Sequence, residues 1–74
     1  MKYALVIERS PHNFAAYVPD LPGCVSTGAT EDDALRAIHE AIEFHLDGMH
    51  EDGLPIPRPL STVAVIDIPG RGAA

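Results

Sequence analysis

The stretch Val18-Pro19-Asp20-Leu21-Pro22-Gly23-Cys24-Val25-Ser26-Thr27-Gly28-Ala29-Thr30 decides the fold, because it joins a strand-like segment to a strong helix start. Proline fixes φ and glycine permits conformations closed to other residues, so this stretch begins as a constrained loop. Leu21-Pro22-Gly23-Cys24 is typical of a type II turn, with Pro second and Gly third, where φ must be positive. The loop is therefore either a rigid connection or a shaped binding element.

A long amphipathic helix is expected after this loop. Thr30 begins a capping box with Asp33, and the acidic first turn suits the positive end of the helix dipole. The apolar residues then recur at the spacing of one helical face: Ala34, Leu35, Ile38, Ala41, Ile42, Leu46 and Met49. Gly53 is a suitable left-handed stop and Pro55 forbids continuation, which places the helix from about Glu31 to about Asp52.

Extended segments are expected on both sides of the helix. Their composition and alternation predict strands at Lys2–Arg9, Phe14–Val18, Cys24–Thr27 and Ser61–Ile68. The short Ser10–Asn13 turn makes the first two strands antiparallel, and the helical crossover would place the last strand parallel to the first. The sequence thus predicts a two-layer α+β fold of order β-β-β-α-β, with an antiparallel-rich four-stranded sheet and one long helix on one face.

Length and composition predict one small globular domain. Seventy-four residues are too few for two cores, so we expect a single domain over residues 1–68 and a flexible tail over residues 69–74. No apolar run is long enough to span a bilayer, and the N-terminus has no secretory signal pattern. A single cysteine cannot form an internal disulfide. These features favour a cytoplasmic protein that does not associate with membranes.

The net charge of −6 favours a basic protein as partner and disfavours direct binding of nucleic acid. A phosphate-binding surface needs clustered Lys and Arg, whereas the five basic residues here are scattered along the chain. Solubility is the simpler explanation of the charge.

Several short motifs, in a fixed order, resemble the HicB-like antitoxin family of bacterial type II toxin–antitoxin systems. They are Phe14-x-x-Tyr17-Val18-Pro19-Asp20-Leu21-Pro22-Gly23-Cys24, Gly28-x-Thr30-x-x-x-Ala34, Glu40-Ala41-Ile42-x-x-His45-Leu46 and Gly53-x-Pro55-Ile56-Pro57-x-Pro59. The resemblance implies a partial ribonuclease H-like fold with strand order 3-2-1-4. It also implies that the chain binds and occludes a small, basic HicA-type mRNA endoribonuclease. The chain resembles a short form without the C-terminal DNA-binding domain that the family often carries.

The candidate site residues follow from this interpretation and from the pattern of the chain. The partner-binding candidates are Pro19, Asp20, Leu21, Pro22, Glu31, Asp32 and Phe44. We expect the loop residues and the first-turn acids to combine at one end of the molecule. Phe44 lies off the apolar stripe, so it is either a partner contact or a residue packed beneath the returning segment 54–59. An uncovered sheet face also predicts a homo-oligomer.

Two other classes of function stay open, although no catalytic, metal or cofactor-binding residue is predicted. A metal-dependent nuclease would need converging carboxylates, and Glu8 and Asp67 are the acids expected on strands. His39 and Glu43 have a spacing that a metal can bridge, but further ligands are lacking, and Cys24 has no partner base. A structural homo-oligomer without a toxin partner is the other alternative.

Overall fold

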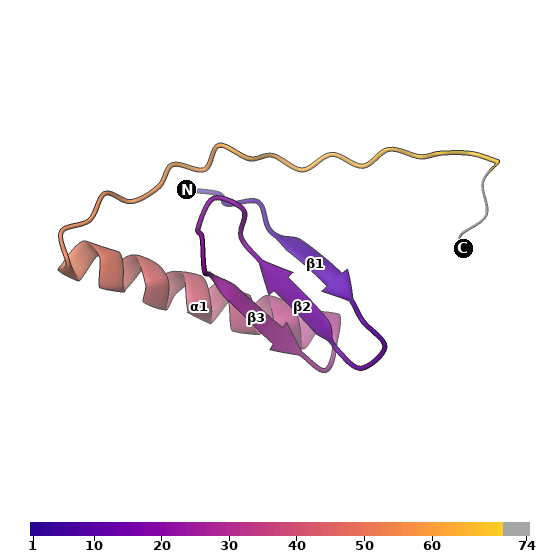
Figure 1. Cartoon of the computed structure of the whole chain (residues 1–74), viewed down its shortest axis with the longest axis horizontal. Coiled ribbons are helices and arrows are strands. Elements are labelled where there is room, and N and C mark those ends of the chain that lie inside the picture. Colours follow the sequence, from indigo (N-terminus) through magenta and orange to yellow (C-terminus); the bar gives the residue numbers. More distant parts are fainter. Residues whose placement is uncertain (71–74) are drawn as a thin grey trace.

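The computed structural model describes residues 1–70 and contains a sheet of three strands with one helix against one face (Figure 1). The strands are β1 (Val6–Arg9), β2 (Phe14–Tyr17) and β3 (Val25–Gly28), and the helix is α1 (Glu31–Glu51). Both strand pairs are antiparallel and the sheet order is β1-β2-β3. The predicted α+β class and the single long helix are confirmed.

Strand register places one row of alternate residues against α1. Ile7 pairs with Ala16, and Ala16 pairs with Ser26 on its other side. Because side chains alternate between the faces of a sheet, these residues share one face. The Ser26 hydroxyl donates a hydrogen bond to the Ala34 carbonyl at 3.2 Å, which identifies this face as the one that α1 covers.

The ends of α1 are those that the sequence predicts. The Thr30 hydroxyl accepts a hydrogen bond from the Asp33 N–H at 3.1 Å, so Thr30 is the N-cap. At the other end Gly53 has φ of +69°, and its N–H donates to the His50 carbonyl while the Leu54 N–H donates to the Met49 carbonyl. These two bonds form a Schellman motif, which satisfies the last helical carbonyls.

The core is small and lies between α1 and the β2–β3 half of the sheet. Its buried side chains are Ala16, Val18, Leu21, Cys24, Ala34 and Ile38. α1 packs mainly against β3 and next against β2, so it is displaced from β1. The flank of α1 nearest the N-terminal segment therefore remains partly uncovered.

The predicted fourth strand is wrong for the described residues. After α1 the chain returns along the sheet through segment 54–59, where the Tyr3 hydroxyl donates to the Pro57 carbonyl. Residues 60–70, which we call the arm, have no strand assignment. The N–H groups of Leu60 and Ser61 donate to the Asp20 carboxylate, so they are not available to a ladder with β1. Among the described residues no strand takes the fourth place of the predicted 3-2-1-4 order. The predicted ribonuclease H-like fold therefore has no support here.

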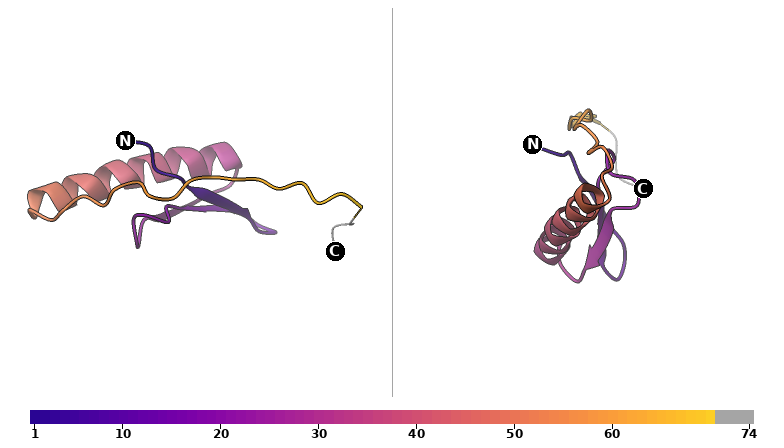
Figure 2. Two further views of the ribbon diagram at one scale, coloured as in Figure 1. Left: turned by 90° about the horizontal axis from the view of Figure 1, so that it is seen from above. Right: turned by 90° about the vertical axis from the view of Figure 1, so that its left-hand side faces the viewer.

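The arm extends well beyond the rest of the molecule (Figures 1 and 2). It contributes to principal-axis extents of 50 × 26 × 16 Å. Figure 1 and the view from above in Figure 2 both show it passing the tip of the β1–β2 hairpin. The expected tail, residues 69–74, lies partly outside the described residues.

Candidate partner-binding surface

The β2–β3 loop is held rigidly by its own backbone. The Cys24 N–H donates to the Leu21 carbonyl at 3.0 Å, and Gly23 has φ of +82°. These are the hydrogen bond and the positive φ of a type II turn, so the predicted turn is confirmed. Two further bonds, from Leu21 N–H to the Val18 carbonyl and from Val18 N–H to the Cys24 carbonyl, fix the loop ends.

The loop residues proposed as partner contacts have different environments. Pro19 and Pro22 are exposed, but the Leu21 side chain has no exposed surface and belongs to the core. Leu21 is therefore corrected from a contact residue to a core residue. Its side chain anchors the loop from below and leaves the two prolines as the outer surface.

Asp20 connects the loop to the arm. One of its carboxylate oxygens accepts hydrogen bonds from the Leu60 and Ser61 N–H groups at 2.9 and 2.8 Å, and the other accepts from the Ser61 hydroxyl at 2.9 Å. The backbone N–H of Ser61 is the main cause that lowers the pKa of Asp20 below its ordinary value. Asp20 thus links the β2–β3 loop to the start of the arm, forty residues away in sequence. Any contact that Asp20 makes with a partner is in addition to this structural role.

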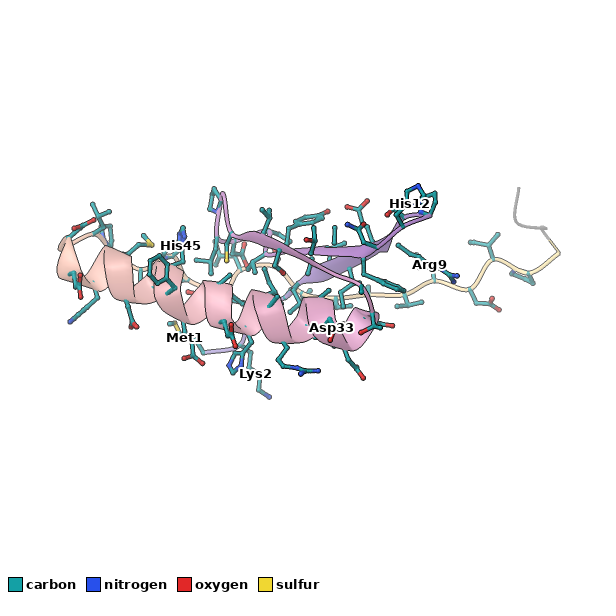
Figure 3. All side chains as sticks on the ribbon, turned by 90° about the horizontal axis from the view of Figure 1, so that it is seen from below. Met1, Lys2, Arg9, His12, Asp33 and His45 are labelled. Carbon is teal, nitrogen blue, oxygen red and sulfur yellow. The ribbon has the colours of Figure 1, made fainter. Side chains whose placement is uncertain are left out.

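The first-turn acids lie at the opposite end of the sheet from the loop. β3 runs from the loop to the start of α1, so its length separates Asp20 from Glu31 and Asp32. Figure 3 shows Asp33 at the end of the molecule that carries Arg9 and His12 of the hairpin tip. The expectation that loop and acids form one surface is wrong, because both ends of a strand cannot meet.

Glu31 and Asp32 nevertheless belong to a continuous acidic element. Eight of the eleven acidic residues lie between Glu31 and Asp52, where Arg36 is the only Lys or Arg, so α1 carries most of the negative charge. Arg36 forms an ion pair with Asp33 at 3.6 Å, with both side chains largely exposed. The outer face of α1 is therefore an acidic surface of the kind that attracts a basic partner.

Phe44 lies in the middle of this acidic surface. Its side chain is 83% exposed, which rules out the alternative that segment 54–59 covers it. Glu40, Asp47 and Glu51 lie four residues before, three after and seven after Phe44, and all are exposed. Helical spacing places them on the same strip as Phe44. An exposed aromatic side chain among carboxylates is suited to anchor a basic partner.

Two apolar surfaces were not predicted from the sequence. One is an open groove of about 480 Å³ between the N-terminal segment and α1, lined by Met1, Tyr3, Leu5, Leu35, Ile38, His39, Ile42, Glu43 and Leu46. Met1 and Lys2 lie along this flank of α1 in Figure 3. The other is a row across the uncovered sheet face, where Tyr17 pairs with both Val6 and Val25. The groove exists because α1 is displaced toward β3, and the sequence pattern does not reveal this displacement.

The arrangement offers little for metal or nucleophilic chemistry. Within residues 1–70 no group of three or more His, Cys, Asp or Glu side chains is placed to hold a metal ion. Asp67 lies on the arm, outside the sheet that carries Glu8, and His39 pairs with Glu43 at 3.1 Å on the exposed helix surface. Burial raises the pKa of the Cys24 thiol, which opposes thiolate formation. In the described part of the chain no helix is both long enough and apolar enough to cross a membrane.

Comparisons with known proteins identify relatives of this chain. A 14.9 kDa protein from the rep-hol intergenic region of Haemophilus phage HP1 is 41% identical over 58 residues, covering 78% of this chain and 44% of that protein. A UPF0150 protein of Helicobacter pylori is 42% identical over 64 residues, with 85% of this chain and 89% of that protein covered. "Antitoxin HicB 2" of Photorhabdus laumondii is 29% identical over 75 residues, with 100% of this chain and 54% of that protein covered.

A solved structure and a family model give the same assignment. A chain of a HicA3 and HicB3 toxin–antitoxin complex superposes with a TM-score of 0.69 at 30% identity, covering 81% of this chain and 70% of that chain. This chain spans about half the length of the phage and Photorhabdus relatives. The family model described as "HicB_like antitoxin of bacterial toxin-antitoxin system" matches residues 3–71. The match covers nearly the whole chain, and the protein belongs to the HicB-like antitoxin family.

Proposed function

We propose that this protein binds and occludes a small, basic HicA-type mRNA endoribonuclease, and that the outer face of α1 is the docking surface. Membership of the antitoxin family supports the class of function, and the likeness to a chain of a HicA3 and HicB3 complex supports the class of partner. In this role the protein is a binding module without chemistry of its own, and a partner that cuts mRNA places both in the cytoplasm.

The observation that carries the choice of surface is the exposed Phe44 on an acidic helix. Exposing a phenylalanine costs free energy in the unbound protein, and covering it in a complex recovers that free energy. The surrounding carboxylates of Glu40, Asp47 and Glu51 complement a basic surface that must also attract RNA. A protein seated there would block RNA from the toxin's positive surface, which is the occlusion mechanism.

The experiment measures how this protein inhibits RNA cleavage by a purified HicA-type toxin. Wild-type protein should abolish cleavage at equimolar concentration. Phe44→Ala should weaken toxin binding by about 10- to 100-fold, as expected for a central aromatic anchor. Leu60→Ala is the matched control, because Leu60 is also 83% exposed but lies on the arm. Equal affinities for the two variants would reject α1 as the docking surface.

Charge reversal tests the electrostatic part of the proposal separately. The double variant Glu40→Lys/Asp47→Lys should slow association and reduce its salt dependence, whereas Glu8→Lys on β1 should change neither. Glu8, Glu40 and Asp47 are all exposed, so reversing their charges leaves the core intact. Failure of the wild-type protein to bind the toxin at all would reject the antitoxin function itself and favour the alternative of a structural homo-oligomer. Metal-dependent RNA cleavage by the protein alone would favour the nuclease.

A further inference from the structure

The outer edge of β3 has no partner strand among the described residues. β3 pairs with β2 on one side and lies at the end of the sheet order β1-β2-β3 (Figure 1). The Val18 N–H donates to the Cys24 carbonyl at 3.2 Å, which fixes the phase of the β2–β3 ladder. Because bonded and unbonded positions alternate along an antiparallel strand, Ser26 turns its backbone groups toward β2, whereas Val25 and Thr27 turn theirs outward. Two N–H and two C=O groups of β3 therefore point away from the sheet.

β3 also lacks the features that usually protect an edge strand. Its sequence, Val25-Ser26-Thr27-Gly28, contains neither a charged residue nor a proline. β1, the strand at the other edge, contains Glu8 and Arg9. Soluble proteins usually place charges or prolines on exposed edges, because an unprotected edge pairs with extended segments of other proteins. The edge of β3 is thus suited to bind a strand from another molecule.

The flank of α1 on this side of the molecule continues the docking surface proposed above. Asp33 lies directly against the end of β3, since a Cβ built on Gly28 would be 2.8 Å from the Asp33 Cβ. Phe44 follows Asp33 by eleven residues, which is close to three helical turns, so both lie on one flank. Leu35 and Ile42, which line the apolar groove beside the N-terminal segment, lie about half a helical turn away. The edge of β3 and the exposed Phe44 therefore border the same side of the domain.

Charge decides which kind of molecule fits this edge. α1 packs mainly against β3, and segment 31–52 contains eight of the eleven acidic residues. A second copy joined through its own β3 would bring two acidic helices side by side, and their repulsion opposes that pairing. A basic segment is attracted to the same place. Side chains of an added strand alternate between the faces, so one set meets the side of α1 and the other lies beside Val25 and Thr27 on the uncovered face.

We propose that a HicA-type toxin adds an extended segment of alternating basic and uncharged residues to the edge of β3. Its backbone bonds to the outward groups of Val25 and Thr27, and its basic side chains face α1. This contact rests on the proposed function and adds backbone pairing to the side-chain contact at Phe44. Backbone pairing fixes the position and direction of the toxin on the domain, whereas Phe44 and the carboxylates supply contact area and attraction.

The first test is amide hydrogen exchange of the full chain, measured by NMR with and without a purified HicA-type toxin. Binding should slow exchange at the Val25 and Thr27 amides by at least about tenfold, because both N–H groups become hydrogen-bonded. The Arg9 amide is the matched control on the other edge of the sheet and should be unchanged. Its N–H also points away from β2, because the next residue, Ser10, donates its N–H to the Asn13 carbonyl.

A proline substitution tests the same contact by affinity. Thr27→Pro removes one outward N–H and leaves the bonds between β3 and β2 in place, because the Thr27 N–H takes no part in them. This variant should bind the toxin at least about tenfold more weakly. Arg9→Pro makes the same change on the edge of β1 and should bind as the wild type does. Circular dichroism verifies that both variants fold, and if Thr27→Pro does not, the exchange measurement on the wild type decides alone.

The outcomes separate this contact from the proposed function. Toxin binding with unchanged exchange at Val25 and Thr27, or with unchanged affinity of a folded Thr27→Pro, would overturn the strand pairing and leave the proposed function standing. A wild type that does not bind the toxin would reject both together. Slower exchange of the same two amides when the protein alone is concentrated would assign the edge to a second copy, and would overturn the proposal.

Discussion

The close approach of Gly28 to α1 allows a sharp test of how the helix is seated on the sheet. A methyl group at this position would place its Cβ 2.7 Å from the Asp33 carbonyl carbon and 2.8 Å from the Asp33 Cβ, with the Ala34 nitrogen nearer still. Ordinary contacts begin at 3.4 Å. Two of the three atoms belong to the backbone, so no side-chain rotation relieves the overlap. Gly28→Ala must therefore push the start of α1 away from β3.

The cost of this displacement can be bounded. Adding a methyl group to a closely packed site typically destabilises a protein by about 1–3 kcal/mol. The loss should lie toward the upper part of this range, because α1 makes most of its contacts with β3. In a domain of this size each kcal/mol lowers the melting temperature by about 4–8 °C. Gly28→Ala should therefore melt about 10 °C or more below the wild type.

The same substitution at Gly48 is the matched control and should have the opposite sign. Gly48 lies inside α1, and a Cβ there would have nothing within 4 Å. Alanine is favoured over glycine in a helix by about 0.8–1 kcal/mol, so Gly48→Ala should melt higher. Both melts are followed by circular dichroism at one protein concentration, because self-association shifts the midpoint. If Gly28→Ala melted at or above the wild type, the described contact between β3 and α1 would be refuted.

Three further outcomes are expected. Gly23→Val should destabilise the fold by about 1–3 kcal/mol, because a β-branched residue is strained at φ of +82°; an unchanged thermal melt would contradict the turn. The pKa of Asp20 is lowered in the fold, so its hydrogen bonds to the arm are present at neutral pH and are lost as the pH falls below 3.8. The amide NMR shifts of Leu60 and Ser61 should follow this titration, and they should not change with pH in Asp20→Asn. Asp32→Lys should cost only about 0.3–1 kcal/mol in a melt but should slow toxin association at low salt, and an unchanged association rate would exclude Asp32 from the electrostatic surface.

The parts of the fold that the sequence predicts well are those with local causes. The Pro22-Gly23 turn, the Thr30 cap and the Gly53 stop each depend on residues within a few positions, and all three have the expected hydrogen bonds. The fourth strand is different, because a strand exists only where another strand pairs with it. Residues 61–68 have strand composition, but the sequence does not say whether their partner lies in the same chain.

The candidate site was predicted less well because exposure is a property of the whole fold. Leu21 and Phe44 are both apolar residues, yet one is fully buried and the other is 83% exposed. The position of Phe44 off the apolar stripe was informative, whereas the loop motif around Leu21 gave no sign that its side chain points inward. The apolar groove depends on the displacement of α1 toward β3, which no pattern along the helix records.

Asp20 illustrates why a conspicuous charge can have a structural purpose. From the sequence it is an acid in a constrained loop and hence a candidate contact for a basic partner. In the fold its carboxylate accepts hydrogen bonds from two backbone N–H groups and one hydroxyl of the arm. By binding them, Asp20 fixes the start of the arm against the loop between β2 and β3.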